Sequence, residues 1–177
     1  MSDIEVPTKR LTLLRHAQAD QNALHDVDRT LTLAGRGDAR VIGERLHEAG
    51  VAPQLVLCST ATRARQTWQL VANAYPQSAE TIEVKYLELL YGADLEEMLE
   101  LLQGLGEETT DVLVVGHEPV SSAVAHHLAG PSSQEAAALR VRTGLSTATA
   151  ALFSYRGPWQ RLDRHSAVLT ALATCRS

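Results

Sequence analysis

Cysteine and positive charge are both scarce in this chain. Its two cysteines, Cys58 and Cys175 among 177 residues, are too few for a disulfide framework, and neither has a Cys-x-x-Cys or zinc-ligand spacing. Sixteen Lys and Arg against 21 Asp and Glu leave a formal net charge of −5, whereas a nucleic-acid-binding protein normally has a basic face. We therefore expect core thiols and no nucleic-acid partner, and any anionic ligand must be attracted by local positive charge.

Long hydrophobic runs and a leader-like start are also missing. The longest apolar stretches, "DVLVVGH" and "SAVLTALATC", are far shorter than a membrane span. The opening "MSDIEVPTKR" has acids and a proline where a signal peptide has an apolar segment. The sequence thus predicts a soluble, cytoplasmic protein with no membrane partner. Its length, its 45% hydrophobic content and the lack of a linker predict one domain over 1–177.

Strand-like and helix-like segments alternate along the chain. The strand-like segments are 10–15, 54–59, 81–86, 111–117 and 148–155. The helix-like segments are 32–49, 60–75, 94–104 and 118–129, with Thr32, Ser59 or Thr60, and Asp94 as expected N-caps of the first three. This alternation predicts an α/β fold, a three-layer α/β/α sandwich with a mainly parallel central sheet. Segment 131–147 has no clear pattern, and segment 159–177 fits either a strand or a helix.

Basic residues follow several of the predicted strands. Arg15 and His16 end the first strand, Arg63 comes just after the second, and His117 ends the fourth, while Glu88 follows the third. In folds of this type, ligands bind beyond the carboxyl ends of the parallel strands. Two histidines and two arginines delivered to one edge of the sheet therefore indicate a functional site.

Phosphoryl transfer is the chemistry that such a set of side chains supports. A neutral imidazole at His16 can attack phosphorus in line and hold the phosphoryl group covalently until water removes it. The forked guanidinium groups of Arg15 and Arg63, with a second imidazolium at His117, are suited to stabilise the charge of the transition state. We expect this chemistry to proceed without a metal or another cofactor.

Three motifs resemble those of the histidine phosphatase (phosphoglycerate mutase-like) superfamily. "LLRHAQAD" is similar to its Arg-His-Gly motif, and "CSTATRARQT" resembles its Ser-Pro-x-x-Arg-Ala-x-Gln-Thr segment. "LVVGHEPVSSAVAHHLAG" is similar to the second histidine of the family and the helix behind it. Within the superfamily, the short chain, the segment "DRTLTLAGRGDA" and the lack of a large helical insertion look most like the SixA-type phosphohistidine phosphatases.

The resemblance implies a role for each matching residue. His16 would be the nucleophile, and the phosphate pocket would be formed by Arg15, Arg63 and His117. Arg29 would line that pocket as well, and Gln18 lies where it can touch the substrate. Ala17 replaces the usual glycine of the first motif and Thr60 a common proline of the second, and neither change removes a catalytic group.

Glu88 and several other polar residues have two interpretations each. In mutase-like members an acid after the third strand protonates the leaving oxygen, and "YLELLYGAD" places Glu88 near that position; a surface glutamate is equally consistent. Two groups of residues contain possible metal ligands, but neither has a ligand spacing known for metals. We interpret the first group as a solvated acidic loop, and it consists of Asp20, His25, Asp26 and Asp28. The second group, His126 and His127, consists of neighbouring helix residues whose side chains point apart. Arg65 should face away from Arg63.

The sequence therefore predicts a metal-independent phosphatase with a covalent intermediate on His16. The substrate would be phosphohistidine on a protein partner or a small phosphate ester. Two alternatives stay open: a phosphoglycerate mutase-like small-molecule phosphatase or mutase, and a phosphate-binding module without turnover.

Overall fold

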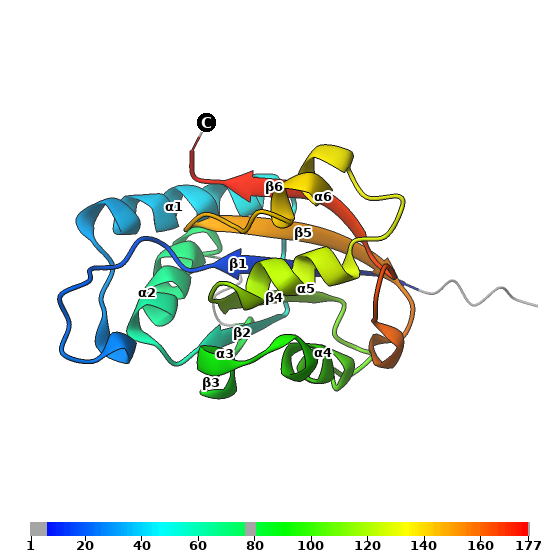
Figure 1. Ribbon diagram of the computed structural model, residues 1–177, viewed down its shortest axis with the longest axis horizontal. Coiled ribbons are helices and arrows are strands. Elements are labelled where there is room, and N and C mark those ends of the chain that lie inside the picture. The colour runs from blue at the N-terminus through cyan, green and yellow to red at the C-terminus, as the bar shows by residue number, and fades with distance from the viewer. Residues whose placement is uncertain (1–6, 77–80, 177) are drawn as a thin grey trace, which may run out of the picture.

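One six-stranded sheet lies between two layers of helices (Figure 1). The computed structural model describes residues 7–76 and 81–176. The strands are β1 (Thr8–Arg15), β2 (Leu55–Ser59), β3 (Glu83–Leu87), β4 (Asp111–Gly116), β5 (Thr149–Arg156) and β6 (Val168–Thr174). The α-helices are α1 (Leu33–Glu48), α2 (Thr62–Val71), α3 (Leu89–Gly92), α4 (Leu95–Gln103), α5 (Val120–Leu128) and α6 (Glu135–Val141). The 3-10 helices are η1 (Asp26–Asp28), η2 (Ala72–Ala74) and η3 (Trp159–Arg161).

The sheet is mainly parallel, as the alternation of strands and helices predicts. Its strand order is β3-β2-β4-β1-β5-β6. The pairs β3–β2, β2–β4 and β4–β1 are parallel, whereas β5 runs antiparallel to both β1 and β6. The four parallel strands therefore end at the same edge of the sheet, which we call the carboxyl edge.

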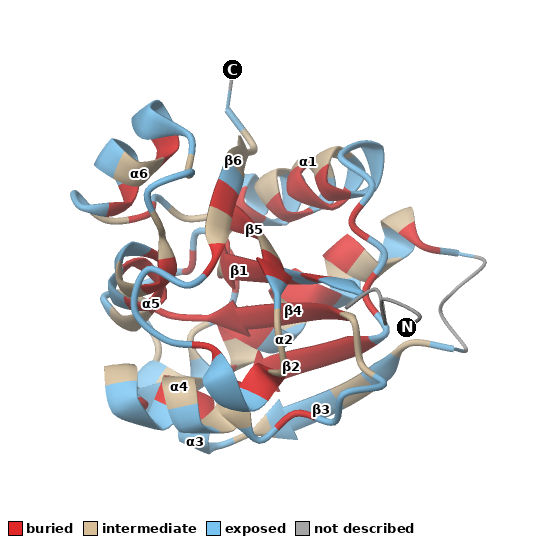
Figure 2. Cartoon of the chain, turned by 90° about the vertical axis from the view of Figure 1, so that its right-hand side faces the viewer, coloured by how far each residue is buried: buried red, intermediate tan, exposed pale blue. Residues whose placement is uncertain are grey.

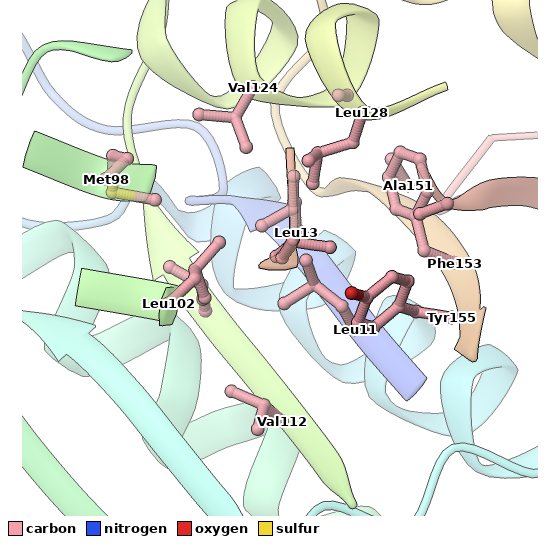
Figure 3. Close-up of a cluster of buried hydrophobic side chains, with 14 of the residues drawn as sticks. Leu11, Leu13, Met98, Leu102, Val112, Val124, Leu128, Ala151, Phe153 and Tyr155 are labelled. Atoms are coloured by element: carbon pink, nitrogen blue, oxygen red, sulfur yellow. The ribbon is translucent and has the colours of Figure 1, made fainter. Parts of the chain in front are cut away.

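Each face of the sheet is covered by its own hydrophobic core. Alternate residues of β1 point to opposite faces, as the period of a strand requires: Leu11 and Leu13 join one cluster, and Leu14 joins the other. The first cluster packs under α4, α5 and α6 and includes Leu102, Leu128 and other residues shown in Figure 3. The second lies under α1 and α2. Figure 2 shows α4, α5 and α6 on one side of the sheet, α1 on the other, and the central strands buried between them.

Two of the three predicted N-caps are confirmed. The Thr32 side chain accepts a hydrogen bond from Gly35 N at the start of α1. The Asp94 side chain accepts one from Glu97 N, and Glu97 returns a bond to Asp94 N, which completes a capping box. The third prediction is wrong, because α2 begins at Thr62 and its N-cap Ala61 supplies no side-chain bond. The Ser59 hydroxyl contacts His117.

The two segments left open by the sequence have regular structure. Segment 131–147 contains α6, and segment 159–177 contains η3 and β6. The choice of strand for β6 comes from its pairing with β5, a tertiary contact that the local pattern does not encode. The single-turn helix α3 was not predicted. Within residues 7–76 and 81–176, no helix has the length and apolar character needed to cross a bilayer.

Candidate active site

A crevice opens at the carboxyl edge between β1 and β4. The chain leaves β1 toward α1 on one face of the sheet and leaves β4 toward α5 on the other, so the loops diverge and leave space between them. A cavity of about 330 Å³ lies there. It is lined by Arg15, His16, Gln18, Ala19, Gln21, Arg29, Arg63, His117, Glu118 and Thr147. Six predicted site residues, Arg15, His16, Gln18, Arg29, Arg63 and His117, thus lie in one cavity.

His16 is held in one orientation by the main chain beside it. Its Nδ1 lies 2.8 Å from the carbonyl oxygen of Ala17, and a carbonyl only accepts hydrogen bonds, so Nδ1 carries the proton. The Nε2 lone pair is then free to act as an acceptor, and Arg63 Nε donates to it over 3.2 Å. Ala17 is fixed in turn, because its backbone N–H donates to the Thr67 hydroxyl at 3.0 Å. The ring therefore presents an unprotonated nitrogen to the cavity.

Both histidines of the cavity are neutral at pH 7. Burial, opposed by the bond to Ala17 and aided by the positive charges of Arg63, Arg15 and Arg29, lowers the pKa of His16 to about 4. Burial also lowers the pKa of His117 to about 3, with His16 and Arg63 adding to the effect. In the protein without a ligand His117 is therefore neutral, chiefly because its ring is buried, and the imidazolium expected at His117 in the transition state stays a prediction. A neutral His16 is what the nucleophilic role needs.

His117 faces His16 across the crevice with one ring nitrogen unused. The two ring centroids are 5.1 Å apart. His117 Nε2 lies 2.8 Å from the Ser59 hydroxyl, whereas Nδ1 is buried and has no hydrogen-bond partner among the described residues. Tyr91 packs edge-on against the same ring with centroids 5.7 Å apart. His117 is thus anchored on one side and can bind a ligand through the other.

The carboxylate of Asp26 joins two of the arginines. Arg63 donates to Asp26 Oδ2 at 3.0 Å and to its carbonyl oxygen at 2.7 Å, and Arg29 donates to Asp26 Oδ1 at 2.9 Å. The Tyr91 hydroxyl donates to Asp26 Oδ2 at 2.8 Å. The bonds from Arg29 and Tyr91, followed by that from Arg63, hold the pKa of Asp26 far below its usual value. Asp26 is half exposed, as the prediction of a solvated acidic loop requires, and it also pairs with two arginines of the cavity.

Arg15 and Gln18 border the cavity next to the first histidine. Arg15 Nη1 donates to the carbonyl oxygen of Leu145 at 2.6 Å, while its Nε is buried without a partner in the described part of the chain. Gln18 Oε1 accepts a bond from the Thr32 hydroxyl at 3.2 Å. Gly35 is needed at this point, because a Cβ there would lie 2.0 Å from the Gln18 carbonyl oxygen. The loop after β1 is therefore packed closely against the first turn of α1.

Glu88 does not reach this cavity. Its side chain is exposed at the N-terminus of α3, and it lines neither this cavity nor the one beside it. The residue from this segment that contacts the site is Tyr91. The expectation of a catalytic Glu88 is thus not supported by its position, and the surface interpretation agrees with it.

The remaining polar residues weighed in the sequence lie elsewhere. Arg65 stacks on Tyr86, with its guanidinium carbon 5.1 Å from the ring centroid, so it faces away from the cavity as expected. His127 contacts Asp163 at 3.0 Å, and His126 lines a separate surface cavity. In the described ranges, no three His, Cys, Asp or Glu side chains are placed to hold a metal ion together.

Sequence reasoning missed Asp26, Tyr91, Ser59 and Glu118 as site residues. Glu118 follows His117 directly, and its carboxylate accepts bonds from Leu145 N at 2.7 Å and from the Ser122 hydroxyl at 2.6 Å. Its place next to a strand-end histidine is a signal that could have identified it. Asp26 and Tyr91 had no such signal, because they meet across 65 residues of sequence.

Comparisons with known proteins agree with this geometry. The family model for the histidine phosphatase superfamily (branch 1) matches residues 11–98. An uncharacterized protein of Mycobacterium leprae is 35% identical over 163 residues, covering 89% of this chain and 97% of its own. A solved structure from Nakamurella multipartitia, provisionally named phosphohistidine phosphatase SixA, is 31% identical, with a TM-score of 0.81 over 94% of this chain and 95% of its own.

A second solved structure supports the same relationship. It comes from Agrobacterium tumefaciens and is also provisionally named phosphohistidine phosphatase SixA. It is 31% identical, with a TM-score of 0.73 over 83% of this chain and 92% of its own. The likeness therefore extends over nearly the whole chain and beyond the residues that the family model matches.

Proposed function

The chain belongs to the histidine phosphatase superfamily, and on that premise we propose that it is a metal-independent phosphatase with His16 as its covalent nucleophile. The observation that carries the proposal is the state of His16: Nδ1 donates to Ala17, and Nε2 keeps its lone pair at the centre of a cavity lined by three arginines. A neutral, oriented imidazole is the form that can attack phosphorus.

The reaction has two displacements at phosphorus. In the first, a bond forms between His16 Nε2 and phosphorus while the bond from phosphorus to the leaving group breaks, and the leaving group keeps the electron pair of that bond and takes a proton from solvent water. In the second, water attacks phosphorus on the phosphohistidine, the P–N bond returns its electrons to Nε2, and inorganic phosphate leaves while one proton of the attacking water returns to solvent. The main-chain bond from Nδ1 to Ala17 stabilises the positive charge that the ring bears in between.

An arginine and the second histidine supply the electrostatic stabilisation. Arg15 Nε and His117 Nδ1, both buried and unpartnered in the described residues, would donate to the equatorial oxygens of the transferred group. A bound phosphate would raise the pKa of His117, since a nearby negative charge favours the imidazolium. Arg63 must release Nε2 before attack, because it now donates to the lone pair that has to meet phosphorus.

Phosphohistidine on a protein or a small phosphate ester is the substrate that we propose. Two relatives of similar fold are provisionally named phosphohistidine phosphatases. Glu88 does not line the cavity, so its carboxyl group cannot protonate a leaving group there. This fits a leaving group that departs readily once protonated, as imidazole does. An alcohol leaving group gains more from a general acid, so phosphohistidine should be the better substrate.

Steady-state kinetics with and without chelator test the proposal. Purified protein should hydrolyse nitrophenyl phosphate, and saturating EDTA should leave kcat/KM unchanged, while vanadate should inhibit because it can adopt the five-coordinate geometry of the transition state. Loss of activity on chelation, restored by a divalent ion, would contradict the metal-independent mechanism. Binding of phosphate without any turnover would favour a phosphate-binding module.

A further inference from the structure

A second cavity adjoins the catalytic one and contains two more arginines. It has a volume of about 570 Å³, and Arg15 and Glu118 form part of the wall of both cavities. On its far side it is lined by Arg140, Arg142 and the loop that follows α6. We call it the side cavity. A molecule bound at His16 can therefore extend into it past Arg15.

The charge in the side cavity is positive and largely uncompensated. Its one acid, Glu118, is bonded to Leu145 N and to Ser122 and makes no ion pair with an arginine in the described residues. The Arg142 side chain has no hydrogen bond or ion pair within residues 7–76 and 81–176, and Arg140 has one long contact of 3.5 Å to the Ser146 hydroxyl. The cluster is therefore locally positive, although the chain has a net charge of −5.

Capping of α6 does not account for these arginines. Basic residues often bind the free carbonyl groups at the end of a helix. Here the Arg140 carbonyl oxygen already accepts bonds from Thr143 N at 3.0 Å and from the Thr143 hydroxyl at 2.9 Å. Arg140 and Arg142 both line the cavity.

The loop that carries the arginines is fixed in place. Gly144 has a φ of +98°, a conformation that favours glycine. The next residue, Leu145, is buried, donates its N–H to Glu118 at 2.7 Å and accepts a bond from Arg15 at 2.6 Å. The side cavity and the catalytic cavity are thus joined by hydrogen bonds through Leu145, which fix the main chain of this loop relative to Arg15.

We propose that the side cavity binds a second anionic group, a phosphate or a carboxylate, on the substrate whose phosphoryl group is transferred to His16. Forked guanidinium groups match the oxygen pairs of both anions. This inference rests on the proposed function and narrows its substrate class to molecules with an acidic group near the reacting phosphate. The second anionic group would belong either to a small acidic metabolite or to an acidic residue beside a phosphorylated histidine.

The test compares pairs of substrates that differ only in the second anion. Alkyl phosphates are measured against carboxyalkyl phosphates and alkanediol bisphosphates of the same chain length, and phosphohistidine peptides with flanking Asn against peptides with flanking Asp. The readout is the ratio of kcat/KM within each pair, so a general loss of activity in a variant cancels. In the natural protein we expect a preference for the acidic member of about tenfold at the best length, or about 1.4 kcal/mol.

Variants of the two arginines assign this preference to the side cavity. In Arg140→Gln/Arg142→Gln the ratio should fall to about one, and Arg140→Lys/Arg142→Lys should keep part of it because the charge remains. Arg161→Gln is the matched control: Arg161 is exposed on η3, whose Trp159 contacts Lys9 at the opposite end of β1. That variant should keep the full ratio.

The outcomes separate this inference from the proposed function. Hydrolysis of every pair at equal rates, or a preference that survives in the double glutamine variant, would overturn the inference and leave the phosphatase in place. Failure to hydrolyse any of the substrates would overturn both. A preference limited to carboxyalkyl or bisphosphate substrates would identify a small acidic molecule, and one limited to Asp-flanked peptides a protein substrate.

Discussion

Basic side chains lie at both ends of β1, and the two ends differ in how the charge is compensated. At the amino end, Lys9 is 1% exposed, forms an ion pair with Glu107 and lies 4.9 Å from the centroid of the Trp159 ring. At the carboxyl end, Arg15, Arg63, His16 and His117 line one cavity. Among the described residues, Asp26 is the carboxylate that forms ion pairs with arginines there.

This difference separates a structural charge from a functional one. The ammonium of Lys9 has a carboxylate and an aromatic face as permanent partners, as a buried charge requires. At the other end, three arginines line the cavity, and Asp26 is the carboxylate that pairs with two of them in the described residues. Two buried nitrogen atoms there, Arg15 Nε and His117 Nδ1, have no hydrogen-bond partner in the described residues. Unpaired buried donors are costly in a folded protein, so they are expected where a ligand completes the site.

Replacement of the nucleophile should have the largest effect on activity. His16→Asn removes the atom that forms the covalent bond, so kcat for nitrophenyl phosphate should fall by about 10⁴-fold or more. The far-ultraviolet circular dichroism spectrum should be unchanged, because the ring sits at the end of a strand and outside both hydrophobic clusters. Retention of more than a few per cent of the activity would remove His16 as the nucleophile.

Removal of a cation at the carboxyl edge should have the next largest effect. Arg63→Gln takes a charge away from the transferred phosphoryl group, and kcat should fall by about 10²–10³-fold. Arg63→Lys should recover only a small part, since an ammonium cannot form the fork that reaches His16 and Asp26 together. Steady-state rates of the two variants check this order, and equal rates for Arg63→Lys and the natural protein would contradict it.

Loss of the compensating carboxylate should have a smaller effect. Asp26→Asn weakens the bonds that orient Arg63 and Arg29, so we expect kcat to fall by about tenfold. Inorganic phosphate should bind more tightly at the same time, because it no longer competes with the carboxylate for these arginines. An inhibition constant for phosphate that rises in Asp26→Asn would show that Asp26 does not compete for them.

The pH dependence should show the burial of His16. Its pKa of about 4 lies below the ordinary value of 6.5, so an unfolded chain binds the proton first as the pH falls. The free energy of unfolding should therefore decrease between about pH 6.5 and pH 4, with no further loss from this group below that. Nuclear magnetic resonance titration of the ring in the folded protein should give a midpoint near 4, and a midpoint near 6.5 would contradict the role of burial.

The smallest effect on activity is expected at the amino end. Lys9→Ala removes a buried stem that packs by Trp159, so stability should fall by about 2 kcal/mol. The kcat of the folded enzyme should stay the same, since Lys9 is at the far end of the strand. Chemical denaturation and kinetics on the same sample measure both quantities, and a loss of kcat at full folding would break the comparison between the two ends.

Sequence patterns predicted the parts of this molecule that local chemistry determines. Strand ends located His16, Arg15, Arg63 and His117, because parallel strands deliver their carboxyl ends to one edge. The role of Asp26 could not be predicted, since it depends on Arg63 and Tyr91, which lie far away in the sequence.

The position of Glu88 depends on the fold of the segment after β3. Its place directly after the third strand suited a general acid, but its side chain at the start of α3 is exposed, and Tyr91 is the residue of this segment that contacts the site. The start of α2 was also mispredicted. The Ser59 hydroxyl accepts a bond from Ala61 N at 3.3 Å and contacts His117, but the helix begins only at Thr62.

Trapping of the covalent intermediate tests the central claim most directly. The protein is mixed with a phosphorylated substrate, quenched in alkali, where phosphohistidine is stable, and digested for mass spectrometry. We predict that one phosphoryl group is found on His16, within the time of one turnover, and that His16→Asn carries none. Full turnover with no phosphoryl group on His16, or a phosphoryl group on another residue that persists in His16→Asn, would contradict the mechanism.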